Sequence, residues 1–213
     1  MSENSRPIGC VIMASGLARR FGSNKLLADF GGRPLLCRAL DATDIPQLAC
    51  RIVVTRSAEV ETLCQTLGAA CLRHALPGRN DTVRLGLEAL LTLQPGLAGC
   101  IFLPGDQPLL RRETVEALVC AFVADTRTQK ETERAIFRLA FQAENDPEPL
   151  VGSPVLFGCG YFSALRTLPE GKGGSVLLRR YPERVCNVFT ADRAELLDAD
   201  TPEALRELKQ FLI

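Results

Sequence analysis

The 213-residue chain has one histidine, His74, and no tryptophan, and none of its nine cysteines forms a Cys-x-x-Cys pair. A structural zinc site gathers cysteine and histidine ligands at short spacing, so the sequence argues against one. The number of cysteines is odd, and several lie in apolar runs such as residues 99–103. Such cysteines are typical of small buried side chains in a reducing compartment.

The chain also carries no net charge at pH 7, because its 25 basic residues balance 25 acidic ones. A general nucleic-acid binder needs a basic face to neutralise phosphates, so we expect no nucleic-acid partner. No apolar run approaches the roughly 18 residues of a membrane span. The N-terminal residues 1–9, MSENSRPIG, show no apolar core of a signal peptide. We therefore expect no membrane partner and a cytoplasmic location.

Short apolar segments alternate along the chain with amphipathic ones. The expected strands are residues 8–13, 51–55, 100–103, 135–142, 154–157 and 185–189. The expected helices are residues 34–42, 58–67, 82–93, 112–124, 161–168, 175–181 and 201–212. Asn80 or Asp81 is the expected N-cap of the third helix. The alternation predicts an α/β fold with a mostly parallel sheet covered on both faces.

The domain organisation follows from what interrupts this pattern. Residues 125–134 are charged and lack large apolar groups, which predicts a solvated surface loop or a polar helix end. No repeat, low-complexity tract or linker is visible, so we expect a single domain over residues 1–213.

The segment MASGLARRFGSNKLL, residues 13–27, follows the first expected strand. Gly16 and Gly22 allow positive φ and leave room for a ligand, and exposed amides there can bind phosphate oxygens. Arg20 can form forked hydrogen bonds to phosphate, and Lys25 supplies a point charge. The spacing matches neither the P-loop nor the dinucleotide fingerprint. Three cations close to the glycines favour a phosphate site over a merely solvated loop.

A second candidate site follows the strand expected at residues 100–103. Asp106 lies there in a Gly-Asp-Gln-Pro turn, where a carboxylate is well placed to hold Mg²⁺ beside phosphate oxygens and water. An ordinary turn aspartate would fit the same position, so the residues alone leave both interpretations open.

The chain resembles the MobA-like nucleotidyltransferases, whose signature is L-A-A-G-x-S-x-R-M-G-x-x-K. The Gly, Arg, Gly and Lys positions match, whereas the departures from the signature are Met13, Ser15, Ala18 and Phe21. The resemblance implies a three-layer α/β/α nucleotide-diphospho-sugar transferase fold, GT-A-like and Rossmann-like. It also implies that Met13, Ala14, Ser15 and Gly16 wrap a nucleotide while Arg20 and Lys25 hold its triphosphate.

Further segments carry the resemblance through most of the chain. The family's Gly-Asp-Gln-Pro aspartate is a metal ligand, which implies Asp106 for Mg²⁺. Residues 198–203, DADTPE, resemble the family's closing D-x-D-T-P-E segment, in which one aspartate would complete the metal site. The cap of the last helix, with proline at its first position, suits Asp200 or Thr201, which leaves Asp198 as the expected second ligand.

Residues 80–87 resemble the family's stretch beside the nucleobase, where Asn80 and Thr82 would read a base edge. Helix capping needs the same residue types, so both interpretations stay open. Thr55, at the end of a strand, is a further candidate to face the nucleotide. Residues 152–157 and 171–175 match a pattern of the molybdenum cofactor cytidylyltransferase branch, although its charged letters differ here.

The resemblance implies magnesium-dependent transfer of CMP from CTP to molybdopterin, with release of pyrophosphate and formation of molybdopterin cytosine dinucleotide. Apo molybdenum hydroxylases would be partners. Guanylyl members carry Gly-Gly in the first turn, and Ala14-Ser15-Gly16 is not a glycine pair, which favours CTP. No general base is needed because the acceptor phosphate is already ionised, so His74 is interpreted as structural.

Three alternatives to this function remain. They are a guanylyltransferase for the same cofactor, a cytidylyl or uridylyl transferase for a sugar or alditol phosphate, and a non-catalytic molybdenum cofactor chaperone.

Overall fold

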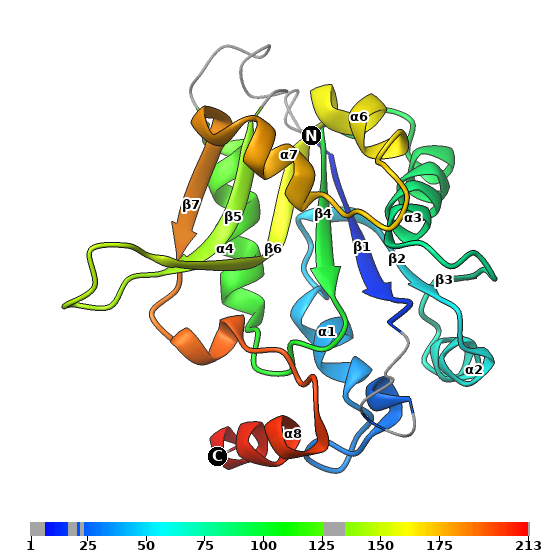
Figure 1. The fold of residues 1–213 in the computed structure, drawn as a ribbon. Helices are drawn as coiled ribbons and strands as arrows, with labels where there is room; N and C mark the ends of the chain where they lie inside the picture. Colours follow the sequence, from blue (N-terminus) through cyan, green and yellow to red (C-terminus); the bar gives the residue numbers. More distant parts are fainter. Residues whose placement is uncertain (1–6, 17–20, 22–23, 126–134, 213) are drawn as a thin grey trace.

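The computed structural model describes residues 7–16, 21, 24–125 and 135–212, which form a seven-stranded sheet between two layers of helices (Figure 1). The strand order is β3-β2-β1-β4-β6-β5-β7. The strands are Ile8–Ala14 (β1), Leu48–Thr55 (β2), Cys71–Arg73 (β3), Gly99–Pro104 (β4), Ile136–Phe141 (β5), Leu150–Gly158 (β6) and Val185–Phe189 (β7). β1 to β4 are parallel, β5 is parallel to β7, and β6 is antiparallel to both neighbours. The predicted three-layer α/β fold with a mostly parallel sheet is confirmed.

Each face of the sheet has its own apolar core. One face is covered by α1 (Leu36–Ala42), α2 (Ala58–Thr66), α4 (Arg112–Val123) and α8 (Pro202–Leu208), and the other by α3 (Arg79–Leu93), α6 (Phe162–Arg166) and α7 (Ser175–Arg180). Short 3-10 helices are η1 (Lys25–Leu27), η2 (Cys159–Tyr161), η3 (Pro182–Arg184), η4 (Arg193–Leu196) and η5 (Lys209–Phe211). Successive side chains of β1 alternate between the faces, with Cys10 and Ile12 in the first core and Val11 in the second. Burial on both faces explains why the central strands read as continuous apolar runs.

The topology places a switch point, where the strand order reverses, at the carboxyl ends of β1 and β4. The chain adds β2 and β3 on one side of β1, and α3 then carries it back so that β4 pairs with the other side. Ligands of open α/β sheets bind where the strand order reverses in this way. Gly16 lies two residues beyond β1 and Asp106 two residues beyond β4, so both candidate motifs lie at this switch point.

The third helix begins earlier than the sequence predicts. Its first residue is Arg79 rather than Thr82, and its N-cap is Gly78 rather than Asn80 or Asp81. Asp81 instead reaches back, and its Oδ2 accepts a hydrogen bond from the Gly78 amide at 3.0 Å. The acidic residue was correctly placed at the helix start, but it acts at the third helical position.

The strand β3 and the charged segment 125–134 are the other places where the structure and the sequence prediction can be compared. The three-residue strand β3 was not predicted, because its residues 71–73 are too few to show periodicity. Most of the charged segment 125–134 lies outside the described residues. In the part of the chain that the structure describes, no helix combines the length and apolarity needed to cross a bilayer.

Candidate active site at the switch point

Lys25 begins η1, a single turn that the core holds in place. The Oδ1 atom of Asn24 caps this turn by accepting a hydrogen bond from the Leu26 amide at 3.1 Å. Leu26 is buried in the core on the α1 side. Lys25 itself is only 9% exposed, so its ammonium group must find partners within the molecule.

The partners of Lys25 are two carboxylates from distant parts of the chain. Its Nζ forms ion pairs with Asp106 Oδ2 and, at 2.8 Å, with Asp200 Oδ1. The Asp106 side chain is largely buried and that of Asp200 is mostly exposed. The ion pairs join the turn after β1, the turn after β4 and the segment before α8. The sequence indicated Lys25 and Asp106 separately, as a phosphate-binding cation and a metal ligand, and the structure brings the two side chains together.

The electrostatics of the pairs keep Lys25 charged. Burial alone lowers the pKa of the Lys25 ammonium group, but hydrogen bonds and charges from Asp106 and then Asp200 outweigh that effect. The net pKa therefore lies above the ordinary value for lysine. A permanently charged, nearly buried ammonium group is suited to binding a multiply charged anion.

Close backbone contacts fix the position of Asp106. The Gly105 amide donates a hydrogen bond to the Met13 carbonyl at 3.0 Å, and the Ala199 amide donates to the Asp106 carbonyl at 2.9 Å. A Cβ atom on Gly105 would lie 3.3 Å from the Met13 oxygen and 3.2 Å from a Leu36 methyl group. Glycine therefore permits the close approach of the two turns that carry Lys25 and Asp106.

Asp198 adds a third carboxylate to this centre. Its pKa is raised to about 6, chiefly by burial and then by the negative charges of Asp106 and Asp200. A hydrogen bond from Gln107 and the charge of Lys25 oppose the rise without cancelling it. One ammonium group thus faces three carboxylates, and the centre carries excess negative charge that a cation would neutralise.

Gln107 is a positioning residue that the sequence reading missed. Its side chain is 3% exposed and hydrogen-bonds the Asp198 carboxylate, and its Oε1 atom is buried without a hydrogen-bond partner. The sequence does indicate a role for Gln107, because it belongs to the same Gly-Asp-Gln-Pro turn that pointed to Asp106.

The segment before α8 divides its roles differently from the expectation. Thr201 is the N-cap, and its Oγ1 accepts a hydrogen bond from the Ala204 amide at 3.1 Å with Pro202 at the first helical position. Asp200 is therefore not the cap. It lies against Lys25, which sequence spacing could not show because 175 residues separate the two.

The carboxylates supply ligands of the type that Mg²⁺ prefers, one or two of which suffice when phosphate oxygens and water complete the shell. Within residues 7–16, 24–125 and 135–212, no group of three or more acidic, cysteine or histidine side chains is arranged to hold a metal ion. The donor set therefore fits a cation shared with a nucleotide, which Asp106 and Asp198 would hold, rather than a site made wholly by the protein.

Only the first part of the glycine turn is described. Met13 and Ala14 end β1, and Ser15 and Gly16 follow, whereas residues 17–20, 22 and 23, including Arg19, Arg20 and Gly22, lie outside the described residues. Gly16 is exposed, its φ is not positive, and a Cβ atom there would meet nothing within 4 Å. Gly16 therefore does not use the positive φ that glycine allows, but a Cβ atom is absent where the turn borders open space.

Ser15 is held by His74, which the sequence reading treated as structural. The Ser15 hydroxyl donates to the Val54 carbonyl at 3.0 Å, so the His74 Nε2 atom, 3.1 Å away, must donate to Ser15. Burial, followed by the charge of Arg56, lowers the pKa of the imidazole. His74 is thus neutral near pH 7, with its buried Nδ1 atom unpartnered.

Arg56 and Thr55 support the same turn from the end of β2. The Arg56 Nε atom donates to the Ser15 carbonyl at 2.9 Å, and its Nη2 atom donates to the same oxygen. Thr55 is completely buried, donates to the Ala14 carbonyl at 3.1 Å and accepts from the Ser57 amide. Thr55 therefore holds the strand end rather than facing a nucleotide, and Arg56 is a supporting residue that no motif had indicated.

Asn80 and Thr82 are also engaged within the protein. Asn80 Oδ1 accepts a hydrogen bond from the Gly171 amide at 2.9 Å, which ties the start of α3 to the second glycine loop. Thr82 is buried, and its Oγ1 atom lies 3.5 Å from His74 Nε2. Asn80 therefore joins α3 to the second glycine loop, whereas Thr82 belongs to the network behind Ser15, and a role of either in reading a base stays a prediction.

The chain was compared with known proteins. Bifunctional protein GlmU from Anaeromyxobacter sp. (strain Fw109-5) is 35% identical over 130 residues, which cover 57% of this chain and 26% of that protein. The chain thus spans about a quarter of the length of that relative. A probable molybdenum cofactor guanylyltransferase from Pyrococcus horikoshii is 26% identical over 111 residues, 52% of this chain and 54% of that protein.

Among solved structures, CMP:2-keto-3-deoxy-manno-octonic acid synthetase complexed with CTP has the same fold. Its TM-score is 0.70 at 16% identity, with 97% of each chain covered. A family model described as the MobA-like NTP transferase domain matches residues 10–185, from within β1 to the start of β7. The match includes the glycine turn, Lys25 and Asp106, and it covers most of the sequence. The chain belongs to the family of MobA-like NTP transferase domains.

Proposed function

We propose that this protein transfers CMP from CTP to the phosphate of molybdopterin and releases pyrophosphate. The observation that carries the proposal is the ammonium group of Lys25, held nearly buried between Asp106 and Asp200 at the carboxyl ends of β1 and β4. Membership of the MobA-like family and the Pyrococcus horikoshii relative support it.

The chemistry asks the protein for alignment and charge neutralisation. An oxygen of the acceptor phosphate attacks the α-phosphorus of CTP, a new P–O bond forms, and the bond to the bridging oxygen of pyrophosphate breaks. Lys25 would bind the triphosphate and stabilise the negative charge that develops on the leaving pyrophosphate. No proton is removed from the attacking oxygen, which agrees with a neutral His74 used for support.

Mg²⁺ held by Asp106 and Asp198 would neutralise phosphate charge that the single ammonium group leaves uncompensated. Asp200 gives Lys25 a second partner, so the ammonium group would keep one carboxylate if Asp106 held a cation. Gln107 would hold the Asp198 carboxylate in place beside that cation.

The choice of CTP rests on the space beside the turn. Ser15 stands where guanylyl members carry glycine, and its side chain is fixed by hydrogen bonds to Val54 and His74. A fixed side chain at this position leaves less room for a purine. The Arg56 bonds to the Ser15 carbonyl prevent the turn from moving aside.

The test is to incubate the purified protein with Mg²⁺, molybdenum cofactor and each of CTP, GTP, UTP and ATP, and to measure pyrophosphate release. We expect release with CTP and a cytidine dinucleotide product. Release with GTP alone would replace the proposal by guanylyl transfer, and release only with a sugar or alditol phosphate would replace the acceptor. Binding of the cofactor without any pyrophosphate would indicate the non-catalytic chaperone.

Two variants make the assay specific to the proposed site. Asp106→Asn should abolish pyrophosphate release because it removes a carboxylate from the charged centre. Asp44→Asn is the matched control, because it makes the same change at an exposed carboxylate that pairs with Arg51 and precedes β2, at the amino end of the strands rather than at the switch point, and it should leave the rate unchanged.

A further inference from the structure

A cavity of about 270 Å³ lies on the α3 and α7 side of the sheet. Its lining is largely apolar and includes Met13, Val83, Phe102, Val155, Phe157 and Leu178. Met13 links the cavity to the turn that carries Asp106, because its carbonyl oxygen accepts a hydrogen bond from the Gly105 amide. The Met13 end of the cavity is therefore the end from which a bound molecule would approach the proposed reaction centre.

The cavity runs across the sheet from Met13 on β1 to Arg138 on β5. Three of its lining residues, Phe102, Val155 and Arg138, form a row of successive register partners on β4, β6 and β5. Three strand spacings separate β1 from β5, or about 14 Å. The register of β5 and β6 shifts between Arg138 and Leu139, an irregularity that places the extra β6 residues at the cavity wall.

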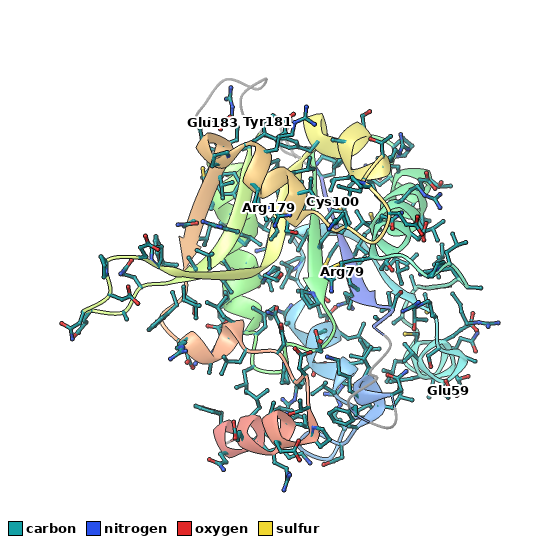
Figure 2. All side chains as sticks on the ribbon, in the orientation of Figure 1. Glu59, Arg79, Cys100, Arg179, Tyr181 and Glu183 are labelled. Atoms are coloured by element: carbon teal, nitrogen blue, oxygen red, sulfur yellow. The ribbon has the colours of Figure 1, made fainter. Side chains whose placement is uncertain are left out.

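Arg138 ends this row with a cationic group that has no acidic partner among the residues that the structure describes. Its Nε atom donates to Asn187 Oδ1 at 2.8 Å, and partial burial lowers the pKa of the guanidinium. Arg79, which Figure 2 labels at the start of α3, also lines the cavity. Among the described residues, neither arginine forms an ion pair. A partly buried guanidinium held only by a neutral amide favours an incoming electron-rich group.

The second glycine loop shapes the opposite wall. A Cβ atom on Gly173 would lie 2.9 Å from Arg79 Cδ, and one on Gly174 would lie 2.9 Å from the Phe157 ring. The loop therefore packs flat against the arginine stem and the aromatic ring because it lacks side chains there. Its Gly171 amide is fixed by Asn80, so the wall is joined to α3.

We infer that this cavity selects the acceptor, and that Arg138, with Arg79 at the rim, is its specificity-determining residue. The acceptor class is an elongated phosphate monoester with a flat heteroaromatic body, whose far end presents acceptor atoms or negative charge to the Arg138 guanidinium. The inference rests on the proposed function, which requires a phosphate monoester at the Met13 end. A sugar body fits poorly, because its hydroxyl groups would lie against apolar side chains without hydrogen-bond partners.

A binding experiment tests the cavity independently of catalysis. Pterin-6-carboxylate, a fluorescent flat heteroaromatic anion, is titrated with the 213-residue protein, and glucose 1-phosphate is titrated in parallel. We expect the pterin to bind and Arg138→Gln to weaken it about tenfold or more, as loss of a charge-assisted forked contact predicts. Arg138→Lys keeps the charge but not the fork and should bind between the two. Arg79→Gln should weaken the pterin as well.

Arg179→Gln is the matched control. Arg179 lies on α7 next to Leu178, is exposed and does not line the cavity, so the same charge change there should leave pterin binding unaltered (Figure 2). Thermal unfolding of each variant separates loss of binding from loss of fold. Absence of pterin binding to the wild type at about 1 mM, equal binding by Arg138→Gln, or tighter binding of glucose 1-phosphate would overturn the inference.

A kinetic arm distinguishes failure of this inference from failure of the proposed function. In the pyrophosphate assay, Arg138→Gln should raise the KM for the acceptor about tenfold and leave the KM for CTP unchanged. An unchanged acceptor KM would reject the role of Arg138 while the transferase activity stands. No pyrophosphate from any wild-type reaction would reject the activity, and the binding arm would still decide the cavity.

Discussion

The Nζ atom of Lys25 lies in ion-pair contact with Asp106 Oδ2, although 81 residues separate them, Lys25 at the start of η1 and Asp106 in the turn after β4. The contact depends on the parallel pairing of β1 with β4, which brings the two following turns to the same edge of the sheet. Each turn supplies one charge of the pair. The sheet thus brings together two local motifs, and nothing in the sequence of either motif indicates its contact with the other.

Substitution of Lys25 tests the role of this ammonium group. Lys25→Ala should lower kcat/KM for CTP by about 10²- to 10³-fold, because a preorganised cation at developing phosphate charge contributes rate of this order. Steady-state pyrophosphate release measures the effect. Lys25→Arg keeps the charge and should recover part of the rate, whereas a Lys25→Ala variant with wild-type kcat/KM would contradict the mechanism.

The ionised Asp198 carboxylate should lower the stability of the folded protein and, at the same time, help to bind Mg²⁺. Burial and the charges of Asp106 and Asp200 raise its pKa to about 6, so the ionised carboxylate is unfavourable in the folded protein at pH 7. Asp198→Asn removes that charge and should raise the Tm by about 2–4 °C, the shift expected for about 1 kcal/mol in a protein of this size. The same variant should need more Mg²⁺ for half-maximal activity.

Thermal unfolding without metal and a Mg²⁺ titration of the rate measure the two effects of Asp198→Asn. Asp192→Asn is a useful comparison, because Asp192 forms an ordinary surface ion pair with Arg111 at 2.6 Å. Its removal should not raise the Tm. A lower Tm for Asp198→Asn would show that the carboxylate is not under electrostatic strain.

The fold could be read from the sequence because its signals are local. The apolar run of β1 and the amphipathic spacing of α4 come from burial of neighbouring residues, and both segments were placed within one residue of their observed ends. Residues 71–73 form a strand only because they pair with Val53, Val54 and Thr55 of β2. Such pairing leaves no periodicity in so short a segment.

The site was readable where residues lie in compact motifs. Lys25 and Asp106 belong to the glycine turn and the Gly-Asp-Gln-Pro turn, and the structure brings them together. Arg56 and His74 belong to no motif. Their contacts with Ser15 arise because β2 pairs with both β1 and β3, which brings the residues that follow these three strands to one edge of the sheet. Arg138 likewise looks like an ordinary polar residue of an alternating strand until sheet register places it at the cavity.

His74 gives the protein a specific dependence on pH. Its folded-state pKa lies below the ordinary value of 6.5, chiefly because of burial, so the unfolded chain binds more protons between the two values. Stability is then full above about pH 6.5 and falls as the pH drops through the folded-state pKa. His74→Gln, which keeps a donor for Ser15 and cannot titrate, should lose less stability than the wild type over this range.

Denaturant unfolding of both proteins from pH 7.5 to 5.5 measures this difference. Comparison with the variant is needed because Asp198 titrates near pH 6 with the opposite effect on stability. His74→Leu supplies a second readout, since loss of the donor to Ser15 should raise the KM for CTP several-fold, whereas His74→Gln should not. Parallel curves of unfolding free energy against pH for the wild type and His74→Gln would show that His74 does not cause this pH dependence.

Gly86 allows α3 to lie close against the sheet, behind the turn that carries Ser15. A Cβ atom there would lie 2.6 Å from Val11 Cγ1 and 3.0 Å from Val54 Cγ2, both in the buried core. Gly86→Ala should therefore push α3 away and destabilise the protein by about 1–3 kcal/mol, although alanine is the better helix former. Such a change lowers the Tm by about 2–4 °C per kcal/mol.

Gly96→Ala is the matched control, because a Cβ atom there meets nothing within 4 Å and the φ is not positive. Calorimetry should show a clear drop in the Tm of Gly86→Ala and little change in that of Gly96→Ala. Equal Tm values for the two variants would contradict the close packing of α3 at Gly86.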